Sequence, residues 1–296
     1  MNAGTTRCGY VALVGRANVG KSTLLNHLLG RKLSITSRKP QTTRHSLLGI
    51  HNTDDTQLLI VDTPGIQETA KKAIDRHMNR ASLGMLADVD LVVMVIDRDH
   101  WTTADDYVLG QVQASRTRAL CAINKVDRLE DKGRLLPLIE RLHGHGIFDE
   151  IIPISALRRR NLEQLVGAIS ARMPESPPLF PEDQITDRDE RFLVQEIVRE
   201  KLVRQLGQEL PYASTVLVES FKADDALAHI HAVIIVEREG QKPIIIGRGG
   251  QRLKLIGTEA RRDIEALLER TVMLELWVKV RDSWADDEMA LRQFGY

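Results

Sequence analysis

The chain reads Gly15-Arg16-Ala17-Asn18-Val19-Gly20-Lys21-Ser22 directly after the apolar run Tyr10-Val11-Ala12-Leu13-Val14. A GxxxxGKS pattern between a buried strand and a helix is typical of a loop whose backbone N–H groups bind phosphate oxygens. The helix that follows, from Ser22 and Thr23 onward, adds the positive end of its dipole. We expect Lys21 to contact the β- and γ-phosphates and the Ser22 hydroxyl to bind Mg²⁺. The alternative is a structural strand-to-helix turn.

A second motif indicates which base carries the phosphates. Asn124-Lys125-Val126-Asp127 follows the apolar run 119–123. The Asp127 carboxylate can accept two parallel hydrogen bonds, from N1–H and the 2-amino group of guanine. Adenine offers neither donor and would leave a desolvated carboxylate unpaired. We expect Asn124 to tie neighbouring loops together and the aliphatic stem of Lys125 to lie on the base.

Two further strand ends carry polar residues. The run 58–61 leads into Asp62-Thr63-Pro64-Gly65, and the run 151–154 leads into Ser155-Ala156-Leu157. We expect Asp62 to hold Mg²⁺ through water, the Gly65 N–H to sense the γ-phosphate, and the Ala156 N–H to contact guanine O6. Ligand sites of open α/β sheets lie at such strand ends. Residues 1–173 are therefore predicted to form a doubly wound, mostly parallel sheet, and they resemble the Ras-like, translation-factor-related GTPases.

The polar segment 37–44 lies between the first helix and the next strand and contains Pro40. We expect it to be a switch that orders while the γ-phosphate is present. One of its two threonines should offer its hydroxyl to Mg²⁺, and the family pattern favours Thr43 over Thr42. An ordinary solvated loop is the alternative. The residues expected to act in catalysis are Lys21, Thr43, Asp62 and Gly65.

Ile66 stands where Ras-like proteins carry the glutamine that orients the attacking water, and we place it in the nucleotide site. An isoleucine cannot orient water, so slow intrinsic hydrolysis is expected. Asn18 resembles the asparagine with which some GTPases bind a monovalent cation, usually K⁺. The alternative is an asparagine that stabilises the turn.

A proline-rich stretch, residues 174–187, separates the first domain from a second one over residues 188–296. Four prolines between 174 and 181 favour an extended, semi-rigid linker. The second part is predicted to run helix-strand-strand-helix-helix-strand, with its first strand over residues 215–218 and with a final helix. The turn Gly247-Arg248-Gly249-Gly250 joins two of these helices. This order resembles a type II KH domain, an α+β module whose Gly-x-x-Gly turn clamps single-stranded nucleic acid.

Positively charged residues are concentrated near this turn. Residues 182–296 carry 17 Lys and Arg against 22 Asp and Glu, whereas residues 242–262 carry six against one. Basic groups at the turn and the following helix are where phosphates of an RNA would lie. The predicted RNA-binding residues are Lys242, Gly247, Arg248, Gly249, Gly250, Arg252 and Lys254.

The whole chain resembles the Era family of bacterial ribosome-assembly GTPases. The resemblance rests on both domains and on residues 34–45, 236–242, 276–280 and 284–288. It implies a GTP-controlled protein that binds the 3′ region of small-subunit (16S) ribosomal RNA and assists assembly of the 30S particle. It also implies some peripheral association with the inner membrane.

Two other functions are weighed against this one. The protein could be a peripheral membrane signalling GTPase whose KH fold binds proteins. A phosphate-loop kinase is a third hypothesis, which the Asn124–Asp127 motif disfavours.

Composition sets further bounds. Lys and Arg together equal Asp and Glu, 41 each, so bulk charge does not direct the protein to RNA. We expect no bilayer-spanning run and no signal-peptide core. Cys8 and Cys121 fit reduced thiols of the cytoplasm. We predict a monomer with the cofactor Mg²⁺ and the ligands GTP and GDP.

Overall fold

The computed structural model describes residues 6–37, 39, 42–70, 72–207 and 210–296. Positions 38, 40 and 41 of the predicted switch segment lie outside the described residues. The chain forms two compact units. The first comprises Met1–Thr36, Thr43–Ala70 and Asp75–Asp187, and the second comprises Ser37–Thr42, Lys71–Ile74 and Arg188–Tyr296.

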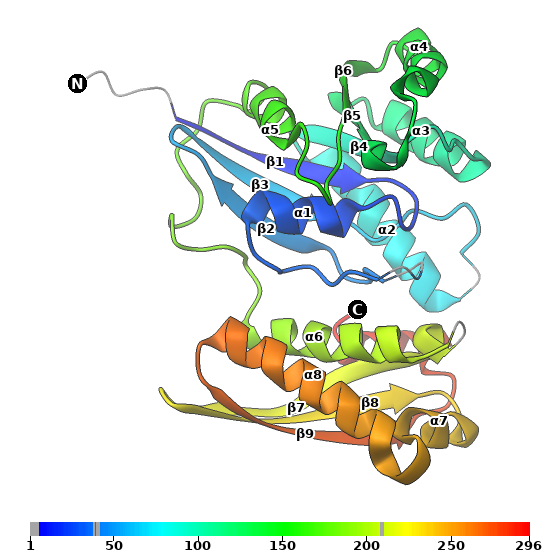
Figure 1. The fold of residues 1–296 in the computed structure, drawn as a ribbon, viewed down its shortest axis with the longest axis vertical. Coiled ribbons are helices and arrows are strands. Elements are labelled where there is room, and N and C mark those ends of the chain that lie inside the picture. The colour runs from blue at the N-terminus through cyan, green and yellow to red at the C-terminus, as the bar shows by residue number, and fades with distance from the viewer. Residues whose placement is uncertain (1–5, 38, 40–41, 71, 208–209) are drawn as a thin grey trace. The chain divides into compact units, whose positions relative to one another are not determined.

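In the described part of the first unit, six strands form one sheet in the order β2-β3-β1-β4-β5-β6 (Figure 1). The β2–β3 pair is antiparallel, and the other neighbouring pairs are parallel. This arrangement confirms the predicted doubly wound, mostly parallel sheet. The strands are β1 (Arg7–Val14), β2 (Leu47–Asn52), β3 (Thr56–Asp62), β4 (Leu91–Asp97), β5 (Ala119–Asn124) and β6 (Phe148–Pro153).

Helices lie on both faces of this sheet (Figure 1). The consecutive apolar residues of β1 (11–14), β4 (91–96) and β5 (119–123) are buried, so both faces of these strands need cover. One face packs against α2 (Ala73–Asp88), α3 (Thr103–Ser115) and α4 (Leu136–Gly144) in a single apolar core. The opposite face carries α1 (Lys21–Leu29) and α5 (Leu162–Ser170).

The predicted linker, residues 174–187, lies within the first unit. The buried side chain of Gln57 fixes it there: Oε1 accepts hydrogen bonds from the N–H groups of Leu179 (2.8 Å) and Phe180 (3.0 Å), and Nε2 donates to the Phe180 carbonyl (2.8 Å). An extended, proline-rich chain leaves its backbone groups unpaired, and this amide supplies partners for two consecutive residues.

The second unit is an α+β module. Within its described residues, three strands form a sheet in the order β7-β8-β9. The β7–β8 pair is antiparallel and the β8–β9 pair parallel. The elements are α6 (Glu190–Gln205), β7 (Ser214–Ala223), β8 (Leu227–Val236), α7 (Lys242–Ile246), α8 (Gln251–Leu268), β9 (Thr271–Val280) and α9 (Glu288–Gln293).

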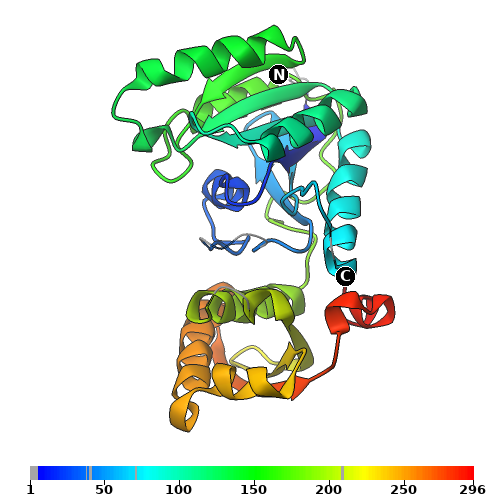
Figure 2. The same ribbon diagram turned by 90° about the vertical axis from the view of Figure 1, so that its right-hand side faces the viewer.

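The two faces of this sheet are covered differently. Helices α6 and α8 share one apolar core with one face, to which α8 contributes Ile256, Ala260, Ile264 and Leu268 at a helical spacing. The terminal helix α9 lies on the opposite side of the sheet (Figure 2), where the fully buried Trp284 packs with Phe294. The order of elements is the predicted one, and it confirms the KH-type fold class.

Element boundaries differ most in β7. We expected a strand over residues 215–218, whereas the strand runs to Ala223. A register shift between Val218 and Ser220 interrupts the alternation of apolar and polar side chains, so the second half does not read as a continuation. Among the described residues, no helix is both long enough and apolar enough to cross a membrane.

Candidate nucleotide-binding site

The predicted motifs meet at one edge of the first sheet. Strands β1, β3, β5 and β6 point the same way, so their carboxyl ends lie together. The phosphate loop follows β1, Asp62 ends β3, and Asn124 ends β5. The Ser155–Leu157 loop follows β6. The parallel topology therefore brings four segments, which lie between residues 15 and 157, to one place.

The phosphate loop enters α1 through a residue that must be glycine. Gly20 has φ 107°, and a Cβ atom there would lie 2.3 Å from Nδ2 of Asn124. Helix α1 then begins at Lys21 without a side-chain cap at its N-terminus. Its first N–H groups are thus left for an anion, which is what a phosphate site requires.

Lys21 is buried beneath this loop. Its Nζ donates to the carbonyls of Gly15 (2.9 Å) and Arg16 (3.0 Å). Burial lowers the pKa of Lys21 to about 8, although the nearby Asp62 carboxylate acts in the opposite direction. The ammonium is therefore held by neutral carbonyls in a site where a phosphate would be a stronger partner.

Hydroxyl groups gather around Asp62. Its Oδ2 accepts from Ser22 Oγ and Ser34 Oγ, both at 2.7 Å, and Ser22 Oγ lies 2.8 Å from Thr43 Oγ1. Burial raises the pKa of Asp62, while Lys21 and the hydroxyls counteract the shift. Within the described residues, the buried Asp62 Oδ1 has no hydrogen-bond partner. A set of hard oxygen donors with one carboxylate oxygen to spare fits Mg²⁺.

The structure distinguishes the two threonines of the switch segment. Thr43 places its hydroxyl beside Ser22, whereas the Thr42 hydroxyl donates to the Lys39 carbonyl at 2.7 Å. This geometry favours Thr43 as the one that joins the oxygen cluster.

Asn124 ties three segments together. Its Nδ2 donates to the Val19 carbonyl (2.8 Å), and its Oδ1 accepts from the N–H groups of Lys125 (2.8 Å) and Ala156 (2.9 Å). The phosphate loop and the loop after β6 are thus fixed to the end of β5. The Ala156 N–H, which we expected to face guanine O6, donates to this amide instead, and its contact with the base stays a prediction.

The residues expected to bind guanine lie close together. Asp127 Oδ1 accepts a hydrogen bond from Ser155 Oγ at 2.5 Å, which orients the carboxylate. Lys125 makes a contact that we did not expect: its Nζ donates to the Asn18 carbonyl at 2.6 Å. The contact of its stem with the base stays a prediction. Val126 connects the same loops through its N–H, which donates to the Ile154 carbonyl at 3.2 Å.

Other predicted residues take structural positions. The Ile66 side chain is buried in the apolar core, and its N–H donates to the Gly15 carbonyl at 3.3 Å. Thr63 Oγ1 donates to the Leu13 carbonyl at 2.8 Å, and the Pro64 carbonyl accepts from Ser82. The Leu157 side chain is exposed.

Three polar residues of the site were not predicted: Ser34, Asp97 and Asp105. Ser34 contacts Asp62, Asp97 contacts Lys125, and Asp105 contacts Arg16. No spacing rule marks them, since each meets its partner across at least 28 residues of sequence.

The Gly-x-x-Gly turn of the second unit has the expected backbone. Gly247, Gly249 and Gly250 all have positive φ, of 74°, 56° and 77°. Gly250 precedes α8, whose N-terminus has no side-chain cap. Arg248 and Lys254 are exposed around the turn, Lys242 is half-buried, and Arg252 Nη1 donates to the Ile244 carbonyl. An uncapped helix start beside exposed basic groups suits a phosphate.

This fold and site define a phosphate-loop GTPase joined to a KH domain. Residues 10–125 match the family described as "50S ribosome-binding GTPase", and residues 209–285 match the KH domain family. The chain is 55% identical to GTPase Era of Ectopseudomonas mendocina, with 100% of this chain and 99% of the relative covered. It is 56% identical to GTPase Era of Pseudomonas syringae pv. tomato, with 98% and 97% covered.

Two solved structures agree with these relatives. A variant of Aquifex aeolicus Era bound to GDP and AlF4⁻ has a TM-score of 0.94 and 43% identity, with 98% of this chain and 99% of that chain covered. Era in complex with MgGDPNP and nucleotides 1506–1542 of 16S ribosomal RNA has a TM-score of 0.95 and 42% identity, with the same coverage. The chain belongs to the Era family, and it is a GTPase.

The lowered pKa of Lys21 predicts a pH dependence of GDP binding. In the free protein Lys21 loses its proton near pH 8, and adjacent phosphates would raise that pKa again. Binding above pH 8 should therefore take up a proton, and GDP affinity should fall as the pH rises from 8 toward 10.5. Calorimetry at pH 9 in two buffers of different ionisation enthalpy, without Mg²⁺, should show an uptake of about one proton.

The matched control is Lys21→Met, whose unbranched side chain is one atom shorter and cannot titrate. It should bind GDP more weakly and without proton uptake. An equal uptake in both proteins would assign the proton to another group.

Proposed function

We propose that the protein is a GTP-dependent switch that binds the 3′ region of 16S ribosomal RNA and assists assembly of the 30S subunit. The observation that carries this proposal is the close structural match to a relative that holds MgGDPNP and nucleotides 1506–1542 of 16S ribosomal RNA together. That match covers 98% of this chain, and both halves contain the required elements. GTP would set when the KH domain binds and releases RNA.

The nucleotide would be held at three places. Backbone N–H groups of Gly15–Thr23, with Lys21, bind the phosphates. Asp127, oriented by Ser155, accepts hydrogen bonds from the N1–H and 2-amino groups of guanine. Ala156 would turn its N–H to guanine O6 by sharing it with, or releasing it from, Asn124.

Mg²⁺ would be bound by the oxygen cluster of Ser22 and Thr43, with Asp62 acting through water. When bound, the ion supplies positive charge beside the β- and γ-phosphates. Ser34 keeps the Asp62 carboxylate in place by donating to Oδ2. The N–H of Gly65 would sense the γ-phosphate and report its loss on hydrolysis.

Hydrolysis would be slow without help, because the buried Ile66 cannot orient a water molecule. We propose that Asn18 helps to bind K⁺ beside the phosphates. Its backbone lies in the left-handed region, with φ 65°, and its carbonyl already accepts a hydrogen bond from the Lys125 ammonium group.

The cation dependence of hydrolysis tests this role of Asn18. The GTPase rate should be about tenfold or more higher in K⁺ than in Na⁺ at equal ionic strength, because the cation stabilises charge that develops in the transition state. Asn18→Ala should remove the difference between the two salts. Equal rates of the unaltered protein in K⁺ and Na⁺ would reject the K⁺ site.

RNA would bind at the turn of the second unit. The glycines Gly247, Gly249 and Gly250 let phosphates approach the main chain closely. The basic residues Lys242, Arg248, Arg252 and Lys254 would neutralise them. We further propose that the protein acts as a monomer in the cytoplasm, with some peripheral association with the inner membrane.

Substituting Gly250 separates RNA binding from GTP hydrolysis. Gly250→Asp places a negative charge where phosphates approach. Its Cβ meets no atom within 4 Å, but φ 77° strains any side chain there, so Gly250→Ala, which carries the same strain without the charge, is measured beside it and should bind RNA more tightly. Affinity for an RNA of nucleotides 1506–1542, measured by fluorescence anisotropy, should fall about tenfold or more, while the GTPase rate stays unchanged. Ala226→Asp adds the same charge in the exposed β7–β8 turn and should bind RNA normally.

Unchanged RNA affinity of Gly250→Asp would contradict the proposed RNA site. It would favour the alternative of a membrane-associated signalling GTPase whose KH fold binds proteins. Equal RNA affinities with GDP and with a non-hydrolysable GTP analogue would contradict the switch.

A further inference from the structure

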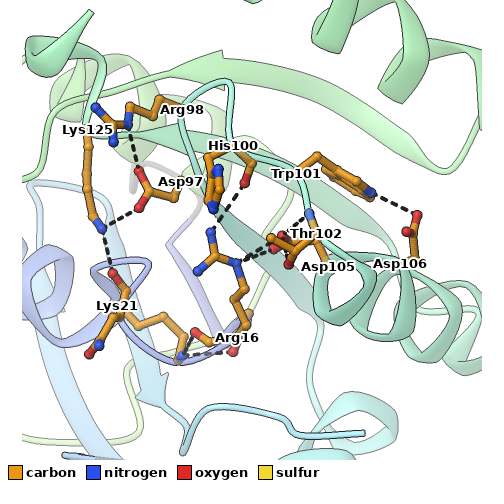
Figure 3. A network of polar contacts seen from close by, with 12 residues as sticks. Arg16, Lys21, Asp97, Arg98, His100, Trp101, Thr102, Asp105, Asp106 and Lys125 are labelled. Atoms are coloured by element: carbon orange, nitrogen blue, oxygen red, sulfur yellow. Dashed lines mark hydrogen bonds and ion pairs between the residues drawn. The ribbon is translucent and has the colours of Figure 1, made fainter. Parts of the chain in front are cut away.

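Two acidic residues flank the connection between β4 and α3. Asp105 contacts Arg16 of the phosphate loop, and Asp97 contacts Lys125. Asp97 ends β4 and Asp105 lies in the first turn of α3. Neither belongs to a motif that binds nucleotide. Figure 3 shows that both face basic side chains of the nucleotide site, Arg16 and Lys125.

Asp105 is fully buried, and its carboxylate is surrounded by donors. Arg16 Nε lies 2.9 Å from Oδ2 and 3.1 Å from Oδ1. Oδ2 also accepts from the Thr102 N–H (2.9 Å) and the Thr102 hydroxyl (2.8 Å). The Thr102 contacts cap helix α3, whereas the Arg16 contacts reach across to another element. Buried charges are stable only when they are paired in this way.

Both the side chain and the backbone carbonyl of Arg16 are therefore held by hydrogen bonds. Its side chain donates to Asp105 and, through Nη2, to the His100 carbonyl at 3.3 Å. Its own carbonyl accepts from Lys21 Nζ at 3.0 Å. The contact between the Arg16 side chain and Asp105 of α3 thus helps to position this carbonyl. It also helps to position the N–H groups that follow in the loop.

A second hydrogen bond holds the phosphate loop at Asn18. Lys125 Nζ donates to the Asn18 carbonyl (2.6 Å) and to the Asp97 carboxylate (2.7 Å). The phosphate loop is therefore anchored on either side of Ala17. A loop that is already in its binding conformation avoids the cost of ordering when the ligand arrives.

We propose that Asp105 is a positioning residue for nucleotide binding, which acts through Arg16 to hold the phosphate loop in its binding conformation. The inference rests on the nucleotide site proposed above. Without the Asp105–Arg16 pair the loop would populate other conformations, and the apparent affinity falls in proportion to the fraction that remains competent. A competent fraction of about one tenth would weaken GDP binding about tenfold.

The test is a double-mutant cycle on GDP affinity, measured by calorimetry with the full-length protein. Asp105→Asn and Arg16→Met should each weaken GDP binding about tenfold, and the double variant should be no weaker than either one, because both remove the same contact. Arg16→Met leaves the Thr102 cap of α3 intact. The melting temperature of each variant is recorded in the absence of nucleotide.

The matched control is Asp106→Asn. Asp106 neighbours Asp105 in the same helical turn, but it pairs with Trp101 Nε1 and Arg141 on the surface. This variant should bind GDP normally. A second reference, Asp127→Ala, removes the guanine contact and should weaken GDP binding strongly.

Any one of three results would overturn the inference. The first is that Asp105→Asn lowers the melting temperature but binds GDP as tightly as Asp106→Asn does. Asp105 would then act only as a cap of helix α3. Additive losses in the double variant would show that Asp105 and Arg16 act separately. If Asp105→Asn does not fold, normal GDP affinity of Arg16→Met alone overturns the inference. Unchanged binding by Asp127→Ala would instead show that the proposed nucleotide site is wrong.

Discussion

The buried amide of Asn124 sets the dimensions of the nucleotide site. Its Nδ2 holds the carbonyl of Val19, and its Oδ1 holds the N–H of Ala156. The distance between the phosphate-binding loop and the base-binding loop is thus fixed by one side chain of 2% exposure. The amide also explains why residue 20 is a glycine, since any Cβ at that position would collide with Nδ2. Asparagine at 124 therefore requires glycine at 20.

Burial also shifts the pKa values of two charged residues in the nucleotide site. Lys21 and Asp62 are both withdrawn from water, which lowers the pKa of the first and raises the pKa of the second. Each change disfavours the charged form until a partner of opposite charge arrives. A nucleotide phosphate would stabilise charged Lys21, and Mg²⁺ would stabilise charged Asp62. The free site is thereby prepared to bind the two ligands together.

Local sequence patterns predicted most of the fold and the outline of the site. The phosphate loop, the Asn124–Asp127 motif and the Gly-x-x-Gly turn each carry a backbone requirement that a short pattern can express. Contacts that join distant segments could not be predicted in this way. Ser34 meets Asp62, and Asp105 meets Arg16, only because the parallel sheet brings them together. The bulge in β7 was missed because it breaks the alternation that reveals a strand.

The selection of guanine by Asp127 is the claim on which the functional account depends. Calorimetry of Asp127→Asn with GDP and with xanthosine diphosphate tests it directly, because an amide at this position donates to the carbonyl that xanthine carries in place of the 2-amino group. The account predicts that GDP binding weakens about 100-fold or more and that xanthosine diphosphate binds more tightly than GDP. Unchanged GDP affinity, with no gain for xanthosine diphosphate, would contradict it.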